Sequence, residues 1–139
     1  MNQIEQIETD VLIIGSGPAG SVAASILQRE KFRVLVVEKQ AFPRFVIGES
    51  MLPISMNLLA DAGLLEAVQK QNFMRKNGAV FLRGDEACNF DFSSQFTDGW
   101  NYTYQVPRAD FDKTLADTVA ARGADTGAPV ARRTGGLAG

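Results

Sequence analysis

The chain has 139 residues, of which 45% are hydrophobic and 22% are charged, a balance typical of one soluble globular domain. Fourteen basic and sixteen acidic residues give a net charge of -2, which argues against a protein that binds nucleic acid or anionic lipid through charge alone. With no histidine and a single cysteine, Cys88, the sequence excludes histidine-dependent catalysis, disulfides, CxxC redox pairs and thiolate metal clusters, so we expect no metal site and a reaction that depends on a bound cofactor.

The first forty residues predict a βαβ unit. Residues 10–14 form a continuous apolar run, as in a parallel strand that is buried on both faces. The glycine-rich turn 15–20 follows, and Pro18 suits the first turn of a helix because a missing N–H costs nothing there. Residues 33–38 (RVLVVE) then predict a second buried strand.

The middle of the chain predicts a region of a different kind. Residues 39–52 read as a long functional loop, and a helix is expected from Pro53 to about residue 62, ended by Gly63. A short helix over 64–71 and a hairpin of 78–83 with 87–92 follow, with a strand over 102–106. The charged residues 74–77 alone indicate a solvated turn.

The last part of the chain predicts one helix and then an irregular tail. Asp110 is a candidate cap for a helix over 110–122 that buries one face and ends at Gly123. Residues 125–139 are rich in Gly, Ala and Arg, so we predict no strand there and a disordered tail, arising from truncation or a shifted reading frame. The partial domain is thus assigned to residues 1–124.

The strongest motif is Gly15-x-Gly17-x-x-Gly20, which lies between a strand and a helix. Gly15 permits the tight turn, Gly17 lets the backbone approach a pyrophosphate, and Gly20 lets the helix pack close to the strand. The N–H groups at the helix start favour phosphate. Glu38 ends the next strand, where its carboxylate can bind ribose hydroxyls and disfavours the 2′-phosphate of NADP. This arrangement indicates FAD or NAD.

Further motifs resemble those of the flavin-dependent halogenases. Residues 42–53 are similar to that family's FPR-x-x-IGES-x-x-P segment, residues 76–81 to its K-x-G-x-x-F, and residues 106–115 to its V-x-R-x-x-F-D-x-x-L. The family shares its FAD-binding fold with p-hydroxybenzoate-hydroxylase-type monooxygenases and geranylgeranyl reductases. The resemblance covers about residues 8–124. It implies an α/β fold, namely the N-terminal portion of a doubly wound, Rossmann-like FAD-binding fold with an inserted helical and hairpin region.

The resemblance also implies roles for individual residues. The expected FAD-binding positions are Gly15, Gly17, Pro18, Ala19, Gly20, Glu38, Lys39, Arg44, Gly48, Glu49, Ser50 and Arg108. Lys76 matches the lysine that holds hypohalous acid beside the substrate. Surface or structural roles compete with these assignments: Arg44 as a surface arginine, Glu49 as a helix-capping acid, and Lys76 as a solvated lysine. Asp112 and Asp117 read as helix-face charges and Cys88 as a small core residue.

In the complete enzyme, the resemblance implies that reduced FAD from a separate flavin reductase, O2 and halide give hypohalous acid for halogenation of an aromatic small molecule. The alternatives are an FAD-dependent aromatic monooxygenase, a geranylgeranyl-reductase-like enzyme, and a non-catalytic nucleotide-binding module. The sequence Tyr102-Thr103-Tyr104 superficially echoes the halogenase W-x-W-x-I-P signature, but its place before Arg108 predicts ordinary strand residues.

Two expectations concern the chain as a whole. Its first ten residues carry three acids and no base, unlike a signal peptide, and its apolar runs are too short to cross a bilayer, so we expect a cytoplasmic protein. Without further strands, the 139-residue chain is expected to be inactive and poorly stable. An unpaired sheet edge and uncovered faces at Val34 and Val36 are the expected reasons.

Overall fold

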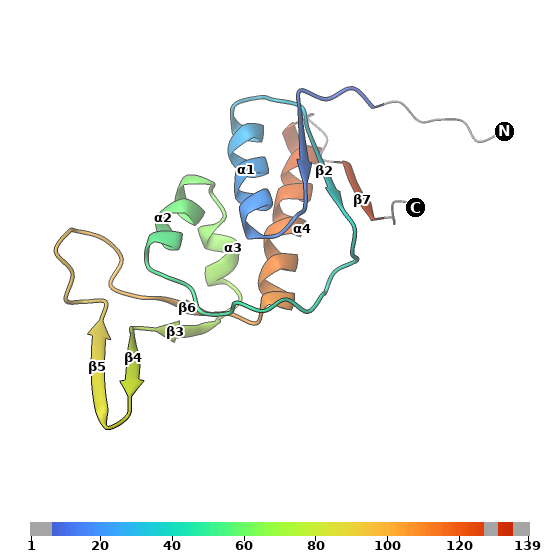
Figure 1. The fold of residues 1–139 in the computed structure, drawn as a ribbon. Helices are drawn as coiled ribbons and strands as arrows, with labels where there is room; N and C mark the ends of the chain where they lie inside the picture. Colours follow the sequence, from blue (N-terminus) through green and yellow to red (C-terminus); the bar gives the residue numbers. More distant parts are fainter. Residues whose placement is uncertain (1–6, 127–130, 135–139) are drawn as a thin grey trace. The chain divides into compact units, whose positions relative to one another are not determined.

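The computed structural model describes residues 7–126 and 131–134. The chain divides into two compact units, one formed by Met1–Ala41 with Leu115–Gly139 and the other by Phe42–Thr114. Figure 1 shows the elements in chain order. Because each unit has its own set of contacts, the two are described separately.

The first unit begins with the predicted βαβ arrangement. Strand β1 (Val11–Ile14) leads into helix α1 (Pro18–Arg29), and strand β2 (Val34–Glu38) lies parallel to β1 with Val11 opposite Val34. Pro18 is the first residue of α1, as predicted. The right-handed crossover typical of such units brings the carboxyl ends of both strands to the same sheet edge, beside the glycine-rich turn.

Only one face of this small sheet is buried in the described part of the unit. Val34 and Val36 are 1% and 3% exposed, so the expectation that they would be uncovered was wrong. They are covered because α1 and the second half of helix α4 (Arg108–Thr126) lie on that face, where Val36, Ala24 and Val119 line one small cavity. On β1, Leu12 and Ile14 point to the same face and are exposed. The prediction that this strand is buried on both faces was therefore wrong for that face.

The predicted irregular tail contains a strand. Strand β7 (Ala131–Thr134) lies parallel to β2, giving the sheet order β1-β2-β7, so the expected unpaired edge of β2 is paired. Strand pairing uses main-chain N–H and C=O groups, which residues without β-branched side chains also possess, and this explains why the side-chain pattern failed. The remaining part of the predicted tail, 127–130 and 135–139, lies outside the described residues.

The second unit contains two short helices and two antiparallel pairs of strands. Helix α2 (Ile54–Asp61) ends before Gly63, whose φ of +66° fits the predicted stop, and helix α3 (Leu65–Gln69) follows. The predicted hairpin forms from strands β4 (Gly78–Arg83) and β5 (Glu86–Asp91). Strand β6 (Thr103–Gln105) pairs with strand β3 (Met74–Lys76), so the predicted solvated turn at 74–77 was wrong in its first three residues.

The long helix α4 also differs from its prediction at both ends. It starts at Arg108 rather than Asp110, because the N–H groups of Asp110 and Phe111 bond to the Pro107 carbonyl. Asp110 therefore lies in the first turn instead of capping the helix. At the other end the helix passes Gly123 and continues to Thr126. The predicted buried face is confirmed at Phe111, Leu115 and Val119.

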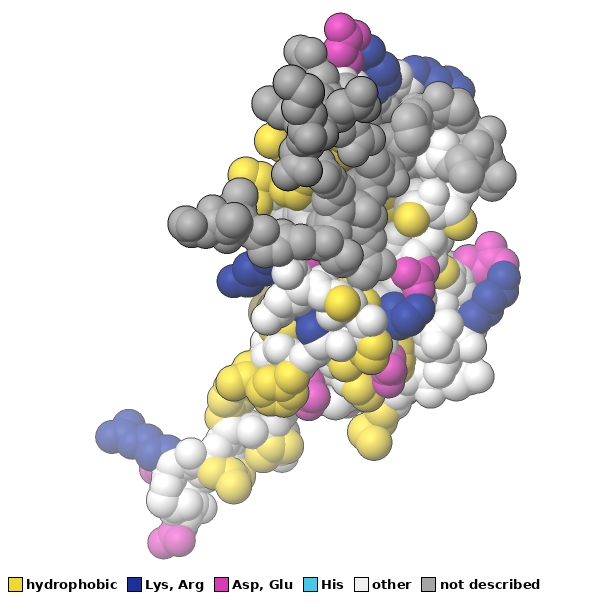
Figure 2. All heavy atoms as spheres, turned by 90° about the vertical axis from the view of Figure 1, so that its right-hand side faces the viewer, with side chains coloured by type: hydrophobic (Ala, Val, Ile, Leu, Met, Phe, Trp, Pro, Cys, Tyr) yellow, Lys and Arg dark blue, Asp and Glu magenta, His cyan; other side chains and the backbone are white. Residues whose placement is uncertain are grey.

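The hairpin carries most of its apolar residues on the surface. Phe81, Leu82 and Phe90 are all more than half exposed, and Cys88 is exposed, so its assignment to the core was wrong. Figure 2 shows hydrophobic side chains gathered on the surface in the lower half of the view. A two-stranded ribbon that packs against no third layer leaves both of its faces open, which explains this exposure.

Within the described residues, no helix is long and apolar enough to cross a membrane. No group of three or more histidine, cysteine, aspartate or glutamate residues is arranged to hold a metal ion in that same part of the chain.

Candidate functional site

The glycine-rich turn of the first unit has the close approach that the motif predicts. Gly15 has a φ of +101°, a conformation that favours glycine. A Cβ atom on Gly20 would collide with the carbonyl oxygen of Gly15, so only glycine fits where α1 passes the end of β1. Gly17 is the N-cap of α1, and the first-turn N–H groups of Ala19 and Gly20 have no acceptor within the helix by its geometry. The turn therefore presents donors and a positive helix end to an anion.

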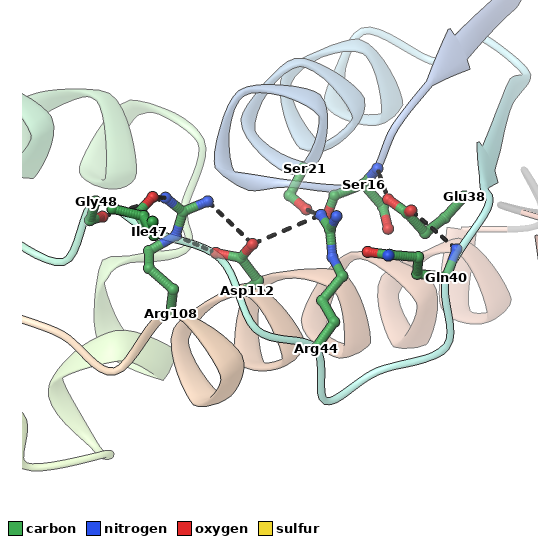
Figure 3. Close-up of polar contacts among 9 residues, drawn as sticks. All are labelled: Ser16, Ser21, Glu38, Gln40, Arg44, Ile47, Gly48, Arg108 and Asp112. Atoms are coloured by element: carbon green, nitrogen blue, oxygen red, sulfur yellow. Dashed lines mark hydrogen bonds and ion pairs between the residues drawn. The ribbon is translucent and has the colours of Figure 1, made fainter.

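Glu38 lies directly beside this turn. Its side chain is 4% exposed, and its Oε2 accepts a hydrogen bond of 2.9 Å from the Ser16 N–H. Its Oε1 accepts a second bond of 3.1 Å from the Gln40 N–H, so backbone donors from both sides orient the carboxylate (Figure 3). Lys39 is the next residue and is exposed. The sequence indicated Glu38, but it gave no sign that Ser16 would be its partner.

The second unit contains a buried charge cluster around Asp112, which the sequence indicated only as a helix-face charge. The Asp112 side chain has no exposed surface, and Arg108 binds it through two contacts, Nε to Oδ1 at 2.7 Å and Nη2 to Oδ2 at 3.1 Å. Arg44 lies 3.6 Å from Oδ2 and is also mostly buried. The spacing of four residues between Arg108 and Asp112 on one helix was the available signal. Arg44 and Arg108 thus both form ion pairs with one buried carboxylate.

Arg108 also holds the segment that contains the predicted flavin-side residues. Its Nη1 donates to the carbonyl oxygens of Ile47 and Gly48 at 3.3 and 3.1 Å (Figure 3). Gly48 has a φ of +104°, and a Cβ atom there would lie 3.4 Å from the same Nη1. The loop conformation at Gly48 and the position of Arg108 therefore depend on each other. Three predicted site residues, Arg44, Gly48 and Arg108, come together in this cluster.

Lys76 is the third point of interest. Its Nζ donates hydrogen bonds of 2.6 Å to Ser50 Oγ and 3.1 Å to the Met51 carbonyl, and it lies 5.2 Å from the centre of the Phe92 ring. The side chain is half-buried on β3, which differs from the solvated turn that the local sequence indicated. Glu49 is exposed, and helix α2 starts after its N-cap Pro53 without a side-chain cap, so the alternative of a helix-capping acid was wrong.

The aromatic residues near β6 form a separate group that the sequence did not predict. Trp100 and Tyr102, and then Tyr102 and Tyr104, make edge-to-face contacts with ring centres 5.4 and 5.8 Å apart. Arg75 lies 3.7 Å above the Tyr102 ring. Burial, together with the hydrogen bond to Tyr102, raises the pKa of Tyr104. The prediction of strand residues is confirmed for Tyr104, which lies in β6, whereas Tyr102 precedes the strand.

The comparisons with known proteins agree with this geometry. The family model described as "FAD binding domain" matches residues 8–131. This chain belongs to that family of FAD-binding domains, and FAD is its cofactor. Within the family its relatives are flavin-dependent halogenases, which confirms the predicted resemblance.

Three relatives illustrate the similarity. The tryptophan 2-halogenase of Chondromyces crocatus is 44% identical over 108 residues, which cover 77% of this chain and 20% of that protein. The crystal structure of a flavoprotein/dehydrogenase from Cytophaga hutchinsonii is 56% identical with a TM-score of 0.80, covering 89% of this chain and 30% of that one. The structure of CmlS, a flavin-dependent halogenase, is 37% identical with a TM-score of 0.77, covering 92% and 23%. The chain thus spans less than a third of the length of these three proteins, and its α/β fold corresponds to part of theirs.

The first unit by itself fits the ADP half of FAD. Gly20 has no room for a Cβ atom and Gly15 has a positive φ, so the turn is built from residues without side chains and offers main-chain N–H groups to a pyrophosphate. The oriented carboxylate of Glu38 at the end of β2 suits a ribose diol, which donates hydrogen bonds. These are the donors and acceptors that the adenosine diphosphate moiety requires.

Proposed function

We propose that this chain is the FAD-binding part of a halogenase-like flavoprotein that modifies an aromatic small molecule. One observation carries the proposal. Lys76 Nζ donates hydrogen bonds to Ser50 Oγ and to the Met51 carbonyl, in the segment that follows Gly48 and Glu49. FAD, when bound in its reduced form, supplies the electrons with which O2 and a halide are converted to hypohalous acid. A separate flavin reductase would deliver the reduced cofactor, and the reaction would take place in the cytoplasm.

In this proposal the first unit binds the ADP half of the cofactor. Main-chain N–H groups of the turn and of Ala19 and Gly20 bind the pyrophosphate, with Pro18 fixing the start of the helix. Glu38 binds the adenosine ribose, and its negative charge disfavours the 2′-phosphate of NADP. Lys39 follows it at the surface and adds a positive charge near the phosphates.

The second unit supplies the residues proposed to face the flavin side. Gly48, Glu49 and Ser50 form the segment beside the cofactor, held by Arg108 through the carbonyls of residues 47 and 48. Arg44 carries a guanidinium group, which suits hydrogen bonding to an anionic group such as phosphate.

Lys76 is the proposed catalytic residue because its amine can take up the halogen. As an ammonium group it can donate a hydrogen bond to hypohalous acid. As an amine it can take the halogen: the N–X bond forms as the O–X bond breaks, and hydroxide leaves with the nitrogen's proton as water. The halogen then passes to a ring carbon, the ring proton goes to solvent, and the amine is regenerated.

The experiment that tests this proposal joins residues 1–124 to the part of CmlS that follows the matched region. With a reductase, O2 and chloride, the wild-type chimera should chlorinate an aromatic substrate. Lys76→Ala should abolish chlorination while flavin oxidation continues. The matched control is Lys70→Ala, which removes an exposed lysine paired with Glu66, and it should behave as wild type. A Lys76→Ala chimera that chlorinates at the wild-type rate would overturn the catalytic assignment.

One finding favours a second candidate function. The flavoprotein from Cytophaga hutchinsonii, 56% identical in sequence, is described as a dehydrogenase. A non-halogenating oxidoreductase, either a monooxygenase or a reductase, would use the same FAD-binding part with Lys76 in an incidental role. Hydroxylated or reduced products without halogen from the wild-type chimera would support this candidate. A third possibility, a nucleotide-binding module without catalysis, predicts FAD binding and no turnover with any of these substrates.

A further inference from the structure

The segment 49–51, which contains Ser50, lies antiparallel to β6 as extended backbone. The Val106 N–H bonds to the Glu49 carbonyl at 2.9 Å, and the Met51 N–H bonds to the Tyr104 carbonyl at 3.2 Å. Between these bonds Ser50 pairs with Gln105 in an antiparallel bridge. Because β6 pairs on its other side with β3, the segment 49–51, β6 and β3 form three adjacent rows of extended backbone.

The register of these rows explains how Lys76 reaches Ser50. Lys76 lies opposite Thr103 on β6, and Ser50 lies opposite Gln105, two residues further along the same strand. Paired residues and residues two apart on a strand project from the same face. Lys76 and Ser50 therefore share one face, and the long lysine side chain crosses β6 diagonally to the serine hydroxyl.

The contact itself is short and involves a charged donor. At 2.6 Å, the bond from Lys76 Nζ to Ser50 Oγ is at the short end of the range for charge-assisted hydrogen bonds. With the Met51 carbonyl it uses two of the three N–H groups of the ammonium, among the described residues. The third N–H points away from these two acceptors by tetrahedral geometry, so it is the one that a ligand can take.

The serine is in turn fixed from the other side. Arg108, oriented by the buried Asp112, holds the carbonyls of Ile47 and Gly48 just before the 49–51 segment. Main-chain bonds to β6 hold the segment on both sides of Ser50. An exposed serine side chain on an anchored backbone needs to order only one rotatable bond to act as an acceptor, whereas a free lysine must order four.

We propose that Ser50 is a positioning residue for Lys76, which holds the lysine nitrogen toward the flavin-side segment so that its third N–H meets the hypohalous acid. The inference depends on the proposed function, since it gives Lys76 a task that only a halogenating enzyme needs. It predicts that removal of the Ser50 hydroxyl loosens the lysine and lets hypohalous acid escape, while the fold and the oxidation of flavin persist.

Nuclear magnetic resonance of the full chain, loaded with FAD and labelled with 15N-lysine, tests the positioning directly. The Lys76 ammonium signal is identified by its loss in Lys76→Arg. Its order parameter should fall by about twofold in Ser50→Ala and return in Ser50→Thr, which restores the hydroxyl. The Lys70 signal and the variant Ser93→Ala, which removes an exposed serine hydroxyl bonded to Asp91, serve as controls and should show no change. An unchanged Lys76 order parameter in Ser50→Ala would overturn the inference.

The chimera with CmlS provides the functional readout. In Ser50→Ala, the chlorinated product per flavin oxidised should fall by roughly tenfold, with a matching rise in hypochlorous acid caught by a soluble trap. Ser50→Thr should restore the product. A full product yield in Ser50→Ala would also overturn the inference. The proposed function fails separately, through a Lys76→Ala chimera that chlorinates normally, so the two failures are distinguishable.

Discussion

The two units assemble their candidate sites in different ways. In the first unit the glycine turn and Glu38 lie within one βαβ motif, in which the bond from Ser16 to Glu38 spans 22 residues. In the second unit, Arg108 reaches Gly48 from sixty residues away, and Lys76 reaches Ser50 from twenty-six residues away. One supersecondary motif therefore brings together the candidate residues of the first unit, whereas those of the second unit come from separate elements, namely the 47–51 segment, β3 and α4.

The largest expected effect comes from breaking the long-range site at Asp112. Asp112→Ala removes a fully buried carboxylate and with it the ion pairs to the largely buried Arg44 and Arg108, which should lower the free energy of unfolding by about 3–5 kcal/mol. Urea denaturation followed by circular dichroism measures this loss. The matched control, Asp85→Ala in the exposed hairpin turn, should have little effect. If Asp112→Ala is as stable as the control, the cluster is not the anchor of this unit.

Gly20→Ala should have the next largest effect, and it tests the local site. The added Cβ collides with the Gly15 carbonyl, so α1 must shift, at a cost of about 3 kcal/mol. The same shift should abolish FAD binding, measured by quenching of flavin fluorescence. Gly99→Ala is the control, because a Cβ there meets only Gln95 at ordinary contact distance. Tight FAD binding by Gly20→Ala would contradict a phosphate site at this turn.

Glu38→Ala tests the first unit through ligand affinity, and its expected effect on ADP binding is larger than its effect on the free energy of unfolding. Loss of the oriented carboxylate should weaken ADP binding by about 1–3 kcal/mol, the cost of an unmet hydrogen-bond partner. Titration calorimetry with ADP measures the change, and the exposed Glu30→Ala provides the control. Unchanged ADP affinity in Glu38→Ala would remove the assignment of Glu38 to the ribose.

The smallest expected effect is a pH dependence at the start of the sheet. The hydrogen bonds from the Arg33 side chain and then from its N–H lower the pKa of Asp10 below its ordinary value of 3.8. A carboxyl group with a lowered pKa stabilises the fold above its unfolded pKa, and this contribution is lost as the pH falls through the folded pKa. The thermal unfolding temperatures of wild type and Asp10→Asn should therefore differ at pH 6, and the difference should shrink only once the pH falls below 3.8 toward the lowered pKa. A constant difference down to pH 2 would contradict the role of this charge.

Much of the first unit could be predicted because its signals are local. The apolar runs, the glycine spacing and the position of Pro18 each depend on neighbours in the chain, and β1, α1 and β2 form as expected. Strand β7 could not be predicted, because the open edge of β2, rather than any side-chain pattern in the tail, provides its hydrogen-bond partners. Strand β3 was not predicted because the charged residues Arg75 and Lys76 suggested a solvated turn, whereas their backbone pairs with β6.

The sequence by itself determined the family, through the motifs at 42–53, 76–81 and 106–115, and the glycine-rich turn between β1 and α1, because these signals act over a few residues. Only the tertiary structure decided that Asp112 is buried between Arg44 and Arg108, and that Lys76 bonds to Ser50. The physical reason is that the burial of a charge and the partner of a flexible side chain depend on which distant segments pack together. The residues proposed to handle the halogen therefore become recognisable as a site only when β3, β6 and the 49–51 segment lie in adjacent rows.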